Sequence, residues 1–219
     1  MTIDVDAPGA GPSTALKSGS WWLPVIIVVA GLVVGIATQI LQGVLPDGWG
    51  VLANSGVMWA LAAFALGAAM PTTRWAVGGG AAQLVIAAVS YYVAVDVFEN
   101  AGTNARATLI WSVAGVIAGS VFGLAGYWFS HHPTWRYPSL SLVGGVLIGE
   151  GIHLAWFVGN TALRPAGLIE LTIGIAVTIL CVVRAGSRSV VLSVIAAASI
   201  GAAGTLAAGQ MIDAVFGAS

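Results

Sequence analysis

WLPVIIVVAGLVVGIATQILQGV, residues 22–44, contains no charged side chain and is apolar almost throughout. A transmembrane α-helix needs about 20 predominantly apolar residues to cross the hydrocarbon core of a bilayer. Because windows of this kind recur along the chain, we predict an all-α, polytopic transmembrane helix bundle of about seven spans. The predicted spans are 22–44, 51–70, 75–97, 107–129, 138–158, 166–183 and 189–212. The start of the second span, residues 45–56 (LPDGWGVLANSG), is polar enough to form part of an interfacial loop.

The composition agrees with a membrane protein. Of 219 residues, 58% are hydrophobic and 7% are charged, against about 25% charged in an average soluble domain. Thirty glycines favour closely packed helices. The net charge is near zero and no basic cluster is present, so we do not expect a nucleic-acid partner. A single cysteine, Cys181, excludes an intramolecular disulfide and a thiolate metal cage.

The chain divides into two parts. Residues 1–20 are rich in Gly, Pro, Ser and Thr and predict a disordered tail, and residues 21–215 predict a seven-span transmembrane domain. The first span lacks the basic start and short apolar core of a cleaved signal peptide, so we expect it to be retained. Basic residues favour the tail side by five (Lys17, Arg74, Arg136, Arg184, Arg188) to two (Arg106, Arg164). The positive-inside rule then predicts a plasma-membrane protein whose amino terminus is cytoplasmic and whose carboxyl terminus is outside.

Two stretches resemble each other. PTTRWAVGGG (71–80) precedes the third span and PTWRYPSLSLVGG (133–145) precedes the fifth, and each span is followed by an asparagine, Asn100 or Asn160. This pattern predicts a parallel repeat of helical hairpins. The alternative is that Pro, Thr, Arg and Trp are simply common at a cytoplasmic interface.

Polar residues gather in the outer half of the predicted spans. In GVLIGEGIHLAWFVGN (145–160), Glu150 and His153 share one helical stripe although an ionised carboxylate in hydrocarbon is costly. Polar stripes continued by glycine are typical of helices that face one another around a wet cavity, so we predict an outward-opening pocket. The candidate ligand-binding residues are Gln39, Gln42, Tyr92, Asp96, Trp111, Glu150, His153, Trp156 and Glu170.

A structural role is the alternative for several of these residues. Acids near a span's outer end, such as Asp96, Glu99 and Asp213, can reach the headgroups. Glu150 and His153 lie too deep for that, but they could pair with each other or with an arginine.

Several kinds of chemistry are excluded by missing residues. A retinal Schiff base needs a lysine within the bundle, and the chain's one lysine is Lys17 in the tail. A di-haem site needs paired intramembrane histidines, whereas only His153 lies deep in a span. One Glu-x-x-His is a weak signal for a carboxylate-bridged metal site, which needs two copies and further glutamates, and there is no H-E-x-x-H motif. We therefore expect no catalytic residue, no metal and no cofactor, and a protein that is not an enzyme, with an intramembrane enzyme as the minority alternative.

Two function classes remain. The first is a transporter or solute-binding membrane subunit with an acidic, aromatic pocket for a small cationic or proton-coupled solute. Its plan resembles the substrate-binding components of energy-coupling-factor vitamin transporters, which carry small-x-x-x-small residues on the first span, as Gly31 and Gly35 do here. The second is a scaffold that binds another membrane protein through such a seam. On the outer side, acids (Asp47, Asp96, Glu99, Glu150, Glu170, Asp213) outnumber arginines (Arg106, Arg164), which favours a cation.

ANSGVMWALAAFALGA (53–68) and AGSVFGLAGYW (118–128) resemble an uncharacterised family of small multi-pass proteins from actinobacteria, over roughly residues 25 to 212. The resemblance implies a plasma-membrane location and no particular substrate.

Overall fold

A computed structural model describes residues 21–46, 48–100, 102 and 104–216. The predicted tail, with Lys17, and Asp47 lie outside these described residues. The described part is helical and contains no strand, as predicted. Its elements are α1 (Trp22–Val44), α2 (Gly50–Ala53), α3 (Gly56–Ala69), α4 (Thr73–Glu99), α5 (Ala105–His131), the 3-10 turn η1 (Pro133–Trp135), α6 (Arg136–Ile152), the π-helical turn η2 (His153–Phe157), the 3-10 turn η3 (Thr161–Leu163), α7 (Arg164–Arg184) and α8 (Arg188–Phe216).

Seven helical segments are long and apolar enough to cross a membrane, which confirms the predicted number. The second combines α2 with α3, and the fifth combines η1, α6 and η2. Some helices extend past the predicted spans, and a charged residue at the helix end can find a hydrogen-bond partner nearby. Arg136, for example, opens α6 and donates from Nε to the Phe129 carbonyl at 3.3 Å.

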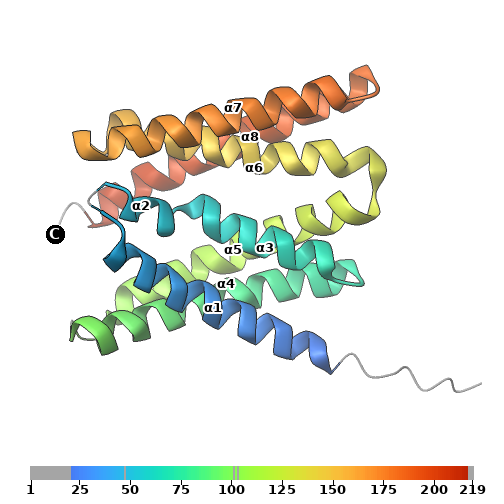
Figure 1. The fold of residues 1–219 in the computed structure, drawn as a ribbon. Helices are drawn as coiled ribbons and strands as arrows, with labels where there is room; N and C mark the ends of the chain where they lie inside the picture. Colours follow the sequence, from blue (N-terminus) through green and yellow to red (C-terminus); the bar gives the residue numbers. More distant parts are fainter. Residues whose placement is uncertain (1–20, 47, 101, 103, 217–219) are drawn as a thin grey trace, which may run out of the picture.

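The helices form two groups. Figure 1 shows α1, α3, α4 and α5 together, with α6, α7 and α8 alongside them. Within the second group α6 packs on both α7 and α8, and α3 and α5 carry the main contacts from the first group to α6. The contact between the two groups is therefore narrow compared with the packing inside each.

Glycines set the closest helix contacts. A Cβ at Gly80 on α4 would overlap the Gly119 carbonyl on α5, and one at Gly145 on α6 would overlap the Ala198 carbonyl on α8. Such small residues let backbones touch where lipid provides no hydrophobic driving force. Gly31 and Gly35 on α1 are used in the same way, because they pack on the α4 backbone near Gln83 and Ala87. The seam that we expected to bind a partner thus holds α1 to α4.

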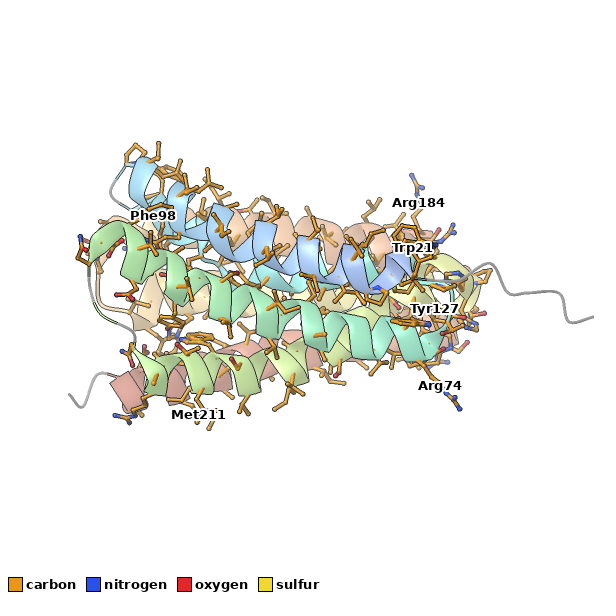
Figure 2. All side chains as sticks on the ribbon, turned by 90° about the horizontal axis from the view of Figure 1, so that it is seen from below. Trp21, Arg74, Phe98, Tyr127, Arg184 and Met211 are labelled. Carbon is orange, nitrogen blue, oxygen red and sulfur yellow. The ribbon has the colours of Figure 1, made fainter. Side chains whose placement is uncertain are left out.

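Successive spans run in opposite directions, so the connections between them alternate between the two ends of the bundle (Figure 1). Figure 2 shows Trp21, Arg74, Tyr127 and Arg184 at one end of the bundle and Phe98 and Met211 at the other. Apolar side chains cover the outside between these ends; Ile117 is 64% exposed and Val183 is 72% exposed. A surface of this kind is what a lipid-facing bundle presents.

The two resembling stretches differ in local structure. Thr72 caps α4 by accepting a hydrogen bond from the Trp75 backbone at 3.4 Å, whereas Thr134 lies inside η1. Asn100 ends α4 in the left-handed region (φ 51°), while Asn160 has a φ of −93° and accepts from the Ala162 backbone. The parallel repeat stays a prediction, without support from these caps.

Candidate functional site

The second span is broken inside the bundle. α2 ends at Ala53, and α3 begins at Gly56 after an extended N-cap residue, Ser55. The sequence Asn54-Ser55-Gly56 explains the break, because serine is a preferred N-cap residue. Ser55 is 1% exposed, and its Oγ accepts from the Val57 backbone at 3.1 Å. The amino terminus of α3 therefore lies within the second span, Gly50–Ala69, rather than at its end.

Glu150 of α6 binds this partly buried helix terminus. Its Oε1 accepts from the Gly56 backbone at 2.9 Å, and its Oε2 accepts from the Val57 backbone and from Ser55 Oγ, both at 3.0 Å. The first N–H groups of a helix have no intrahelical acceptor, and the helix dipole is positive at this end. The carboxylate therefore meets the positive end of α3 and joins the two helix groups.

Glu170 of α7 lies beside this arrangement. It is close enough to Glu150 and Ser55 for both to act on it electrostatically. Glu170 is 5% exposed, and its Oε2 has no hydrogen-bond partner among the described residues. The expected proximity of Glu150 and Glu170 is thus present, in the form of two carboxyl groups around one helix terminus.

His153 has a different environment. Its Nε2 lies 3.5 Å from Asp213 Oδ2 on α8. Its ring packs against Gly209 of α8, where an added Cβ would lie only 2.9 Å from the ring atoms Cε1 and Nδ1. The Glu150–His153 pair that we considered is not formed, because α6 lies between α3 and α8 and directs the two side chains to different neighbours. His153 opens the π-helical turn, which closes with a hydrogen bond of 3.2 Å from the Val158 backbone to the His153 carbonyl.

A second polar cluster lies between α1 and α4, next to α3. Gln39 is 6% exposed and donates from Nε2 to Glu99 Oε1, and Tyr91 donates to Gln42 Oε1 at 3.0 Å. The Tyr91 ring packs edge-on against Tyr92, with 5.1 Å between centroids. Trp59, one turn beyond the Ser55 cap, packs edge-on against Tyr91 with 6.3 Å between centroids. Trp59 thereby connects this cluster to the broken helix.

The remaining candidates lie towards the outside. Tyr92 lies beside Trp111, which is 37% exposed. Trp156 is 53% exposed, and the backbone carbonyl of Asp96 accepts from the Asn100 N–H at 3.0 Å at the end of α4. The nine predicted residues therefore do not line one pocket: the structure brings together Glu150 with Glu170, and Gln39 and Gln42 with the tyrosines. Stripes on neighbouring helices face different partners in this structure, and ligand binding by these residues stays a prediction.

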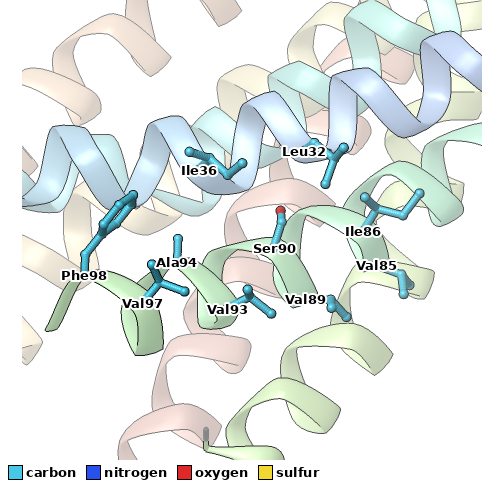
Figure 3. A pocket seen from close by; sticks show the side chains of 10 residues that line it. All are labelled: Leu32, Ile36, Val85, Ile86, Val89, Ser90, Val93, Ala94, Val97 and Phe98. Atoms are coloured by element: carbon cyan, nitrogen blue, oxygen red, sulfur yellow. The ribbon is translucent and has the colours of Figure 1, made fainter. Parts of the chain in front are cut away.

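A groove of about 460 Å³ lies elsewhere, on the outer surface between α1 and α4 (Figure 3). Its lining is aliphatic apart from Phe98 and the Ser90 hydroxyl. None of the nine candidate residues lines it. Within the described residues, no cluster of three or more His, Cys, Asp or Glu side chains could hold a metal ion.

Sequence reasoning did not identify Ser55 or the α3 terminus as part of the site. The available signal was Asn54-Ser55-Gly56 within an apolar run, which is an N-cap pattern inside a span.

The seven apolar helices and the buried polar centre define a polytopic membrane protein. Residues 14–214 match the model of a family of unknown function, DUF6518, and the chain belongs to this family. No curated protein and no solved structure matches the chain.

Proposed function

We propose that the chain is a plasma-membrane transporter, or the solute-binding membrane subunit of one, for a small cationic or proton-coupled solute. The break in span 2 carries this proposal. Irregular backbone inside a membrane is tolerated where it lines a cavity or is held by protein, and discontinuous helices form the binding sites of many secondary transporters. Here the break lies at the narrow contact between two helix groups, where a rocking motion would change access to it.

The charge distribution supports a cationic ligand. Among the described residues, the one carboxylate within ion-pair distance of a basic side chain is Asp213, beside His153. Glu150 and Glu170 therefore have no arginine partner there. A cation or a proton would supply the missing positive charge, and the amide and aromatic groups around Tyr91 would offer further contacts.

The topology supports access from outside. With the amino terminus in the cytoplasm, as the five-to-two count of basic residues favours, both polar clusters lie in the outer half of the bilayer.

The actinobacterial origin that the family resemblance implies also stays a prediction.

A scaffold is the second candidate. The apolar groove between α1 and α4 favours it, because another membrane helix or an acyl chain could occupy that surface.

Thermal unfolding of the detergent-purified protein with a panel of solutes tests the proposal. We expect at least one organic cation to raise the melting temperature of the wild type and of Thr172→Val, but to have a smaller effect on Glu170→Gln. Thr172 lies on the same helix as Glu170, is exposed, and bonds the Leu168 carbonyl of its own helix at 2.7 Å. Indifference to the whole panel, together with co-purification of another membrane protein, would favour the scaffold.

A further inference from the structure

We propose that the Glu150–Glu170 pair binds one exchangeable proton, which Glu170 carries while Glu150 stays bonded to the amino terminus of α3 as a carboxylate. The site lies between α3, α6 and α7, at the contact between the two helix groups.

Hydrogen-bond geometry identifies Glu150 as the anionic member. Three donors converge on its two oxygens: the Gly56 N–H, the Val57 N–H and the Ser55 hydroxyl. A carboxylate accepts all three, whereas a carboxylic acid would direct its own O–H towards a donor. The positive end of the α3 dipole stabilises the same charge.

Burial and isolation identify Glu170 as the proton carrier. Its side chain is 5% exposed, and its Oε2 lacks a partner among the described residues. A second ionised carboxylate next to Glu150 would be both desolvated and repelled. A proton on Glu170 removes that charge and converts an oxygen without a partner into a donor.

No arginine or lysine among the described residues lies close enough to neutralise Glu150 or Glu170 in place of a proton. The α3 side of Glu170 contributes the Ser55 hydroxyl, and α6 contributes Glu150. The basic side chain that acts on Glu150 is His153, the first residue of η2, and it lies against Asp213 of α8. No described arginine or lysine is within ion-pair distance of either glutamate.

Transfer of this proton would loosen the contact between the helix groups. The O–H bond of Glu170 breaks and one forms on Glu150, so the charge of the pair is unchanged. Neutral Glu150 then holds α3 through ordinary hydrogen bonds, which are weaker than charge-assisted ones. This link from proton position to helix movement rests on the proposed transport function, whereas the proton site itself does not.

Infrared spectroscopy of the purified protein in lipid nanodiscs tests the site without a transport assay. At neutral pH we expect a C=O stretching band of a neutral carboxylic acid that shifts in D₂O. The band should be lost in Glu170→Gln, retained in Thr172→Val, and retained at a shifted frequency in Glu170→Asp.

Absence of the band from the wild type would overturn the proposal, whatever the variants do. Its persistence at full intensity in folded Glu170→Gln would assign it to another acid, with the same consequence. Loss of the wild-type band on adding sodium chloride at constant pH, relative to choline chloride, would indicate a sodium site instead. If the proton site is confirmed but no solute stabilises the protein, the transport proposal alone fails.

Discussion

Removal of the Glu150 carboxylate should destabilise the contact between the two helix groups. In Glu150→Ala the Gly56 N–H and the Ser55 hydroxyl lose their acceptor, while the Val57 N–H keeps Ser55 Oγ at 3.1 Å. A buried group left without a partner costs about 1–3 kcal/mol; this full cost applies to the buried Ser55 hydroxyl, and the exposed Gly56 N–H adds a smaller one. Water can reach the exposed Gly56 bond, and Glu170 is relieved of a neighbouring charge. We therefore expect a loss of about 2–4 kcal/mol in the free energy of unfolding.

Glu150→Gln should cost less than Glu150→Ala. The amide oxygen can still accept from Val57 and Ser55, but the amide N–H₂ then opposes the Gly56 N–H. One hydrogen bond to a charged group is lost, worth about 1.5–3 kcal/mol. The measurement is unfolding by sodium dodecyl sulfate in mixed micelles, with Asp96→Asn as an acid-to-amide control. A Glu150→Ala variant as stable as the control would refute the role given to the three hydrogen bonds.

Three further predictions follow from packing, from side-chain direction and from topology. Gly80→Ala, whose Cβ would overlap the α5 backbone, should lower the free energy of unfolding by about 1–3 kcal/mol. Gly78→Ala on the same helix meets no atom within 4 Å and should be neutral or stabilising. Equal effects of the two variants would contradict the close α4–α5 contact at Gly80. His153 acts on Glu150 through its charge but shares no hydrogen-bonding partner with it, so a double-mutant cycle of His153→Ala and Glu150→Gln should give a coupling energy of only about 0.5 kcal/mol, the low end for neighbouring residues. A coupling of about 2 kcal/mol or more would mean that the two side chains bond directly. Cysteines at Thr73 and Asn104, in a cysteine-free background, should react with a membrane-impermeant maleimide from opposite sides, and labelling of both from outside would show that the predicted topology is wrong.

The fold could be predicted because its main signal is local. The composition of an apolar span is enough to recognise it, and no contact with a distant part of the chain is needed. The number of spans was therefore right, and even the uncertain start of the second span coincides with the short α2. The exact ends differed where a charged residue such as Arg136 continues a helix.

The site could be predicted only in part, because its contacts join helices that are far apart in sequence. Depth identified Glu150 and His153 as unusual, and Glu170 was one of the polar candidates in the outer half of the spans. Helical periodicity places residues on a face but does not say which helix that face meets. Glu150 and His153 share a stripe, yet one reaches α3 and the other α8. The main partner of Glu150 is backbone N–H at a helix break, which no search for complementary side chains can find.

Hydrogen–deuterium exchange at the Gly56 and Val57 amides tests most directly whether Glu150 holds the buried terminus of α3. The first amides of a helix have no intrahelical acceptor and ordinarily exchange fast. The structure predicts slow exchange at both amides in the wild type and much faster exchange at Gly56 in Glu150→Ala, with amides in the middle of α5 equally protected in both proteins. Fast exchange at Gly56 in the wild type, or the same rate in the variant, would contradict it.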